Sequence, residues 1–314
     1  MDDDTLFDQD DHFKDLVKSA KRKSLKRTIF VSFLVTLGVL VILWGLAAGG
    51  SYIMYSKMDK QSTDIDELYA ISGANTTSKG TNYDYFFLVG TTKTKILKMV
   101  DTIPIEWDEK KYMYTGFGTA KSFDNDGEYA INSVQHYKND HRVLNFRPPS
   151  VPMVEDDSNF LAQLNDKTIV EVGLSFSNEL TMEEIITEFP SNLSWVWILD
   201  KHNVEMIELQ KEENLPSIGY VDSTSYLTGE EVYGFEVEQE DMLLDAEMFI
   251  NQVEEMAKEK DSWEIKELYD SMNAYTPKEL KGAGVVLTGT VEQLKSYVKK
   301  DIVKHVSVGV IINN

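Results

Sequence analysis

The chain contains one long stretch of uncharged, mostly apolar residues, from Ile29 to Ala48. About 20 helical residues are needed to cross roughly 30 Å of hydrocarbon, and this stretch supplies that length. Thirteen of its residues are Leu, Ile, Val or Phe. At about 0.3–0.6 kcal/mol each, they favour insertion by roughly 4–8 kcal/mol. Tyr52 and Tyr55 follow, where interfacial aromatic residues gather. We therefore predict one transmembrane helix within residues 28–55.

The basic residues around this stretch predict its orientation. Six of them lie shortly before it: Lys18, Lys21, Arg22, Lys23, Lys26 and Arg27. Only Lys57 and Lys60 follow it closely. The positive-inside bias then places the N-terminus in the cytoplasm and residues from about 56 onward outside the cytoplasm. The alternative is a secretory signal cleaved near Ala48, where "WGLAAGG" supplies small residues. The long apolar run and the long, initially acidic segment before it argue against a signal.

The charge of the chain is distributed unevenly. Residues 1–55 contain seven Lys or Arg and seven Asp or Glu, so the formal net charge of -22 lies in residues 56–314. A strongly acidic exterior region repels nucleic acid, so we expect no nucleic-acid partner. The chain has no Cys, and therefore no disulfide. A region of this length can form one or two hydrophobic cores without one.

Residues 1–27 are too few for an independent domain, and we predict a short cytoplasmic head with one helix. Five apolar residues, including Ala20, fall within an arc of about 100° on a helical wheel. The four larger ones form a head stripe, which consists of Leu6, Phe13, Leu16 and Val17. Two or three turns cannot bury it alone. Two interpretations stay open: the stripe rests on the membrane surface, or it docks into a groove on a partner protein. The adjacent basic run is more typical of a topology signal than of a nucleic-acid site.

The exterior region divides by composition. Residues 56–81 are polar and rich in Ser, Thr, Asn and Gly toward their end, which is typical of a tether. Residues 82–147 contain several β-rich stretches without a clear helix, so we predict a β-rich subdomain. Residues 148–159 contain three prolines and an acidic cluster, which predicts a linker.

Residues 160–314 show one strand–helix–strand pattern twice. "KTIVEVGLSF", "TMEEIITEF" and "LSWVWILD" form the first unit, and "GAGVVLTG", "TVEQLKSYVKKD" and "KHVSVGVII" form the second. Both helices begin with a Thr that can cap them. Between the units lie a hairpin-like stretch over 219–238 and a helical stretch over 241–272. We predict an α+β fold with a duplicated βαβ arrangement and a mixed, ferredoxin-like sheet. Trp195 and Trp197 lie on one strand face, which favours packing.

The motifs of common enzymes are absent. The sequence lacks HExxH, GxSxG, a Walker loop and a GxGxxG that opens a helix after a strand. Without Cys it has no thiol nucleophile. His136 and His141 are five residues apart, unlike a helical metal pair, so we expect surface imidazoles. We predict no enzymatic activity, no cofactor and no metal site.

One acidic segment superficially resembles a calcium-binding loop. If Asp124–Glu128 formed the centre of such a loop, Ser122 and Ser133 would occupy its first and twelfth ligand positions. The twelfth position normally holds a bidentate Glu. The segment is therefore interpreted as a turn.

The chain resembles the bacterial membrane anti-sigma factors with sigma factor regulator N-terminal and C-terminal domains, the anti-sigma-M-factor-like group. The N-terminal resemblance lies in "FKDLVKSAKRKSLKRTIFVSFLVTLGVLVILWG" and runs on through "TIPIEW". The C-terminal resemblance lies in "VEVGLSFSNELTMEEI", "LSWVW", "VYGFEV" and above all "GVVLTGTVEQLKSYVKKDIVKHVSVGVI". It implies binding of an extracytoplasmic-function sigma factor at the membrane, which keeps that factor from RNA polymerase. So short a head would bind as a helical peptide or with the help of a second membrane co-regulator.

These observations predict a single-pass regulatory protein in the cell membrane, not an enzyme. The head is the output element, and the exterior α+β region senses a signal or acts as a scaffold. The head stripe is expected to contact the sigma factor. The basic cluster, Tyr52 and Tyr55 are expected at the two membrane interfaces. The alternative is an exterior envelope-binding module whose head is only an anchor and does not contact a sigma factor.

Overall fold

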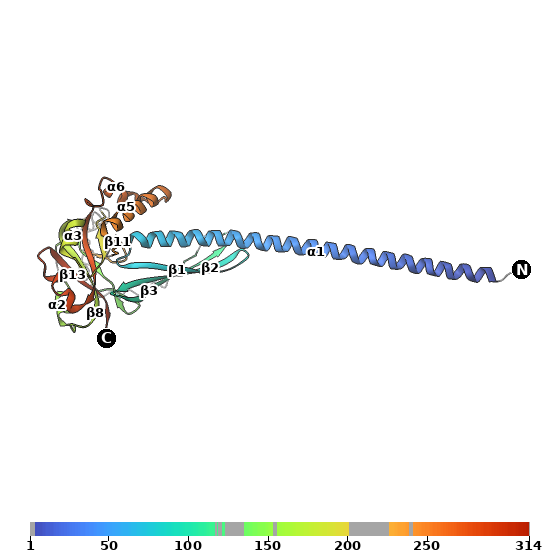
Figure 1. The fold of residues 1–314 in the computed structure, drawn as a ribbon, viewed down its shortest axis with the longest axis horizontal. Helices are drawn as coiled ribbons and strands as arrows, with labels where there is room; N and C mark the ends of the chain where they lie inside the picture. The colour runs from blue at the N-terminus through green and yellow to red at the C-terminus, as the bar shows by residue number, and fades with distance from the viewer. Residues whose placement is uncertain are drawn as a thin grey trace, which may run out of the picture.

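The computed structural model describes residues 4–116, 118, 121–122, 135–152, 156–200, 226–238 and 241–313, with the side chains of residues 4–12 and 15 outside this description. The expected turn at Asp124–Glu128 and the side chain of Leu6 lie outside the described part. One long helix leads into a β-rich body in which several sheets meet (Figure 1).

The helix α1 (Asp4–Ile71) has 68 residues, so it is about 100 Å long. It contains the predicted head and transmembrane segment, and it continues into the predicted tether. The expectation of a tether over 56–81 is wrong for residues 56–71. Apolar side chains on one face of this part are buried: Met54, Met58, Ile65 and Ile71. Packing against the β-rich body stabilises a helix that the polar composition alone does not predict.

The first large sheet has four antiparallel strands in the order β1-β2-β3-β4. They are β1 (Thr76–Phe86), β2 (Val89–Val100), β3 (Ile103–Thr115) and β4 (Lys121–Ser122). The β1–β2 hairpin runs alongside α1, and its turn points toward the N-terminal half of that helix (Figure 1). The predicted β-rich region is confirmed, but it begins at Thr76 rather than at residue 82.

Four very short strands form two smaller sheets. They are β5 (Tyr137–Lys138), β6 (His141–Arg142), β7 (Asn145–Phe146) and β10 (Leu227–Thr228). β5 pairs with β6, and β7 pairs with β10. The prediction of a hairpin over 219–238 is wrong for the described residues of that range. β10 pairs with β7, whereas the strand that follows β10 joins the second large sheet.

The second large sheet has five strands in the order β11-β9-β12-β8-β13. They are β8 (Ile169–Thr181), β9 (Leu193–Ile198), β11 (Tyr233–Glu236), β12 (Lys281–Thr290) and β13 (Val303–Ile312). The strands of both predicted strand–helix–strand units are confirmed. The units interleave: β12 lies between β8 and β9, and β8 lies between β12 and β13. Each strand therefore meets a strand of the other unit, and the recorded neighbours in this sheet are antiparallel, where we expected a mixed sheet.

The helices of the body cover one face of this sheet. They are α2 (Ser158–Gln163), α3 (Met182–Glu188), α5 (Met242–Glu259), α6 (Trp263–Met272), α7 (Val291–Leu294) and the 3-10 helix η2 (Tyr297–Lys299). Their apolar side chains form one core with alternate residues of the strands, including Val172 and Leu174 of β8. Thr181 and Thr290 close capping boxes at α3 and α7, as the pattern predicts.

The opposite face of the sheet is also buried. Trp195 and Trp197 lie there, and the ring of Phe146 has its centroid 6.3 and 5.1 Å from theirs. The prediction that the two tryptophans pack is therefore confirmed. Val151 belongs to the same cluster and is fully buried. The described part of 148–159 thus packs on the sheet instead of forming an exposed linker, because its apolar side chains help to cover the tryptophan face.

Candidate functional site

Three described residues of the head stripe are exposed on the N-terminal part of α1. Phe13 is 66% exposed, Leu16 63% and Val17 40%. Helical spacing places the three on one face, as predicted. The structure thus shows an uncovered apolar surface in the described part of the head, and its partner stays a prediction.

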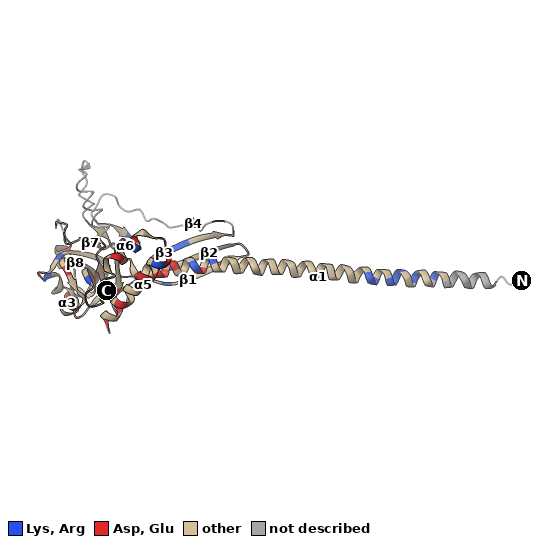
Figure 2. Ribbon diagram, turned by 90° about the horizontal axis from the view of Figure 1, so that it is seen from above, with Lys and Arg blue, Asp and Glu red and all other residues tan. Residues whose placement is uncertain are grey.

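Exposed basic side chains separate the head stripe from the apolar segment (Figure 2). These are Lys21, Arg22, Lys23, Lys26 and Arg27. The apolar segment that follows is exposed along its length and has a mean hydropathy of 2.6. Among the described residues, one helix is therefore long and apolar enough to span a membrane. This helix passes through "WGLAAGG" without a break.

The C-terminal end of α1 is fixed to the β-rich body by backbone and charged contacts. Just after the helix, the N–H of Gly73 donates to the carbonyl of Val232 (3.0 Å), beside β11. Lys260, which ends α5, pairs with Asp64 (2.9 Å) and Glu67 (2.6 Å) of α1. The C-terminal end of the helix that carries the head stripe is therefore attached to β11 and α5 of the C-terminal part of the fold.

A buried ion pair joins the two large sheets. The Lys98 Nζ of β2 lies 2.9 Å from the Glu171 Oε1 of β8, and the two side chains are 2% and 0% exposed. The Asn75 amide donates to the same carboxylate (2.9 Å), and the backbone N–H of Val310 donates to its other oxygen (3.3 Å). Lys98 also lies over the ring of Trp107, 4.2 Å from its centroid. Sequence reasoning missed this contact, although Glu171 is a charged residue inside an apolar strand.

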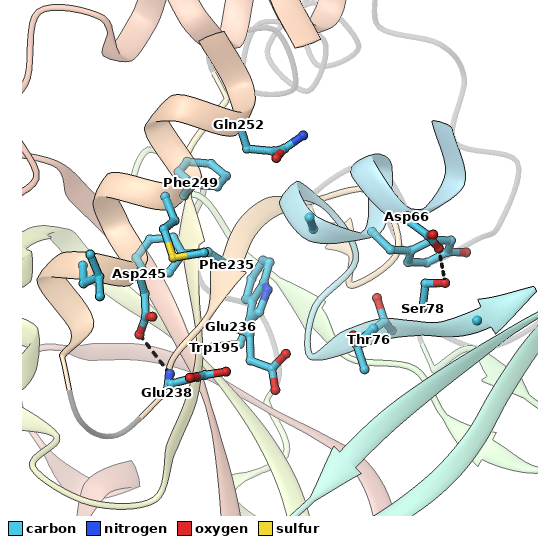
Figure 3. A pocket seen from close by; sticks show the side chains of 16 residues that line it. Asp66, Thr76, Ser78, Trp195, Phe235, Glu236, Glu238, Asp245, Phe249 and Gln252 are labelled. Atoms are coloured by element: carbon cyan, nitrogen blue, oxygen red, sulfur yellow. Dashed lines mark hydrogen bonds between the residues drawn. The ribbon is translucent and has the colours of Figure 1, made fainter. Parts of the chain in front are cut away.

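An open pocket of about 410 Å³ lies where α1, β1, β11 and α5 meet (Figure 3). Glu236 and Asp245 line it, and Asp66 accepts a hydrogen bond from Ser78 at its rim. Burial raises the pKa of Glu236, and the charges of Glu238 and Asp245 raise it further, against an opposing effect of Lys79. Burial also raises the pKa of Asp245. Such a wall suits neutral or positively charged groups better than anions.

The two histidines considered in the sequence occupy half-buried positions, so the expectation of surface imidazoles is wrong. His136 lies 2.7 Å from the hydroxyl of Tyr226 through its Nε2, and His141 belongs to β6. Within the described ranges, no group of three or more His, Cys, Asp or Glu is arranged to hold a metal ion.

A family model matches the C-terminal part of the chain. Residues 161–310 match the family model described as sigma factor regulator C-terminal. The matched region begins in α2, ends in β13 and covers slightly less than half of the chain. No curated protein and no solved structure matches significantly. The matched family is regulatory rather than enzymatic. The part of the chain from α2 to β13 is therefore similar to the C-terminal domain of sigma factor regulators.

Proposed function

We propose that this chain is a membrane-bound anti-sigma factor that binds an extracytoplasmic-function sigma factor through its cytoplasmic head. The family match of residues 161–310 carries the proposal. The exposed head stripe supports it, because an uncovered apolar face on a charged helix suits a groove on a partner protein. Sequestration at the membrane would keep the sigma factor from RNA polymerase, and a second membrane co-regulator would assist so short a head.

In this proposal the exterior body senses a signal or acts as a scaffold. The attachment of α1 to the C-terminal sheet supports this role, since any displacement of the sheet reaches the helix directly. The pocket at the same junction offers a place for a ligand to act on both elements. The interleaved strand order supports a ferredoxin-like duplication as the origin of the sheet.

Copurification tests the function. The tagged full-length chain, extracted from its source cells in mild detergent, should retain a sigma factor identified by mass spectrometry. The Phe13→Asp variant is the matched control and should retain much less, because an unpaired charge is costly in an apolar contact. Normal recovery of the chain without any sigma factor would contradict the proposal. The envelope-binding module would then be the better explanation.

The orientation is a separate part of the proposal, and the Cys-free chain makes it directly measurable. Ser24 and Thr102 are exposed positions on the two sides of the apolar segment. In spheroplasts, a membrane-impermeant maleimide should label Thr102→Cys and should label Ser24→Cys only after lysis. This pattern follows from the excess of Lys and Arg before the span. The reverse pattern would refute a cytoplasmic head.

A further inference from the structure

The turn between β1 and β2 exposes an unusual amount of apolar surface. This hairpin tip consists of Tyr85, Phe86, Phe87, Leu88 and Val89. Phe86 is 81% exposed, and Val89, its cross-strand partner, is 54% exposed. Contiguous exposed apolar side chains of this kind mark a surface that another apolar phase covers.

The backbone of the hairpin tip is strained at an aromatic residue, Phe87. Phe87 begins the two-residue loop with φ of 53°, a region that bulky residues rarely adopt. Tight hairpin turns normally use Gly, Asn or Asp at such positions. A Phe here costs conformational energy without filling a core, which points to a role at the surface.

The tip lies against α1 just beyond the end of the apolar segment. The ring of Phe87 packs so close to Gly50 that a Cβ at Gly50 would lie 2.4 Å from its Cδ2. The backbone N–H of Phe87 donates to the Ser51 hydroxyl (3.3 Å). Tyr55, one turn further along α1, has its ring centroid 5.9 Å from that of Tyr85.

These contacts fix the depth of the tip relative to a membrane. Gly50 lies only about 3 Å beyond Ala48 along the helix axis, because each helical residue rises 1.5 Å. The headgroup layer on each side of the hydrocarbon is about 5–8 Å thick. The hairpin therefore returns from the body to the level at which the chain leaves the hydrocarbon.

We propose that the hairpin tip is a second membrane-contacting element, which inserts its apolar side chains at the boundary of headgroups and hydrocarbon. The occupant of this surface is the lipid bilayer itself, because the exposed tip continues the exposed apolar surface of α1. Phe86 and Val89 are the inserted side chains, and Phe87 attaches the tip to the helix. Lipid contact at two points would limit the tilt of the exterior body on the membrane.

Depth-dependent quenching in nanodiscs tests this proposal with the full-length chain. Single-Cys variants Phe86→Cys and Thr102→Cys, each with an environment-sensitive fluorophore, are placed in phosphatidylcholine nanodiscs at one copy per disc. Thr102 is the matched control, because it lies in the exposed turn at the opposite end of the same sheet. Brominated lipid should quench the label at position 86 several-fold more than the label at position 102. Aqueous iodide should show the opposite preference.

Val89→Cys provides an independent position on the tip if Phe86→Cys does not fold, and it should behave like position 86. Equal iodide quenching at the tip and at position 102 would overturn the proposal. A tip label shielded from both quenchers would mean that protein covers the tip, which would also overturn it. The sigma factor plays no part in this measurement, so its outcome is independent of the proposed regulatory function.

Discussion

Replacement of Phe13 and Leu16 by Asp should raise transcription from the sigma factor's own promoters to the level seen without the protein. Both side chains are exposed on one helix face and free to contact a partner. Two unpaired charges in an apolar contact should cost at least about 2 kcal/mol, and each 1.4 kcal/mol is a tenfold change in affinity. A chromosomal reporter for that regulon measures the effect, with immunoblotting of the membrane fraction to verify abundance.

The matched control is Ser19→Asp, which adds a negative charge to another face of the same exposed helix. It should leave the reporter low, and the basic cluster stays intact in both variants. A flat reporter with the double variant at normal abundance would show that the head stripe is not the inhibitory surface. The stripe would then belong to the membrane surface, and the anchor-only interpretation would gain support.

Replacement of Lys98 by Met should destabilise the β-rich body by about 3–5 kcal/mol, because it leaves the buried carboxylate of Glu171 without its cation. Thermal unfolding of the full-length chain in detergent, followed by tryptophan fluorescence, measures the change. The signal is sensitive here, since Lys98 lies over Trp107.

Lys95→Met is the matched control on the same strand. Lys95 pairs with Glu106 at 2.7 Å, but both side chains are largely exposed, so its loss should cost at most about 1 kcal/mol. The double variant Lys98→Met/Glu171→Leu should recover part of the lost stability, because it removes the unpaired charge. Equal effects of the two Met variants would mean that the buried pair does not hold the sheets together.

Local patterns in the sequence predicted much of the C-terminal fold. Short stretches rich in apolar residues located β8, β9, β12 and β13, and the Thr-x-x-Glu and Thr-x-x-Gln patterns located the helix starts at Thr181 and Thr290. These features depend on neighbours within a few residues. The position of the head stripe on a helix follows from the same kind of periodicity.

Contacts between distant segments could not be predicted in this way. Residues 56–71 look polar in sequence, and they form a helix because one face packs on strands that come later in the chain. The pairing of Lys98 with Glu171 joins residues far apart in the sequence, so the local sequence pattern around each residue does not reveal it. The hairpin tip was hidden for a similar reason: "NYDYFFLVG" has the β-rich composition of a strand, whereas a turn falls inside it at Phe87.

The uninterrupted helix α1 makes the molecule a lever. No proline occurs before Pro104, so the rod from Asp4 to Ile71 has no proline hinge. Its fulcrum is Met54, the first large apolar side chain of the helix that is buried against the body. The arm from Met54 to Phe13 is about 60 Å long, so a tilt of about 5° in the body displaces Phe13 by about 5 Å. Small rotations of the body would thereby be amplified into movements of the head as large as a side chain.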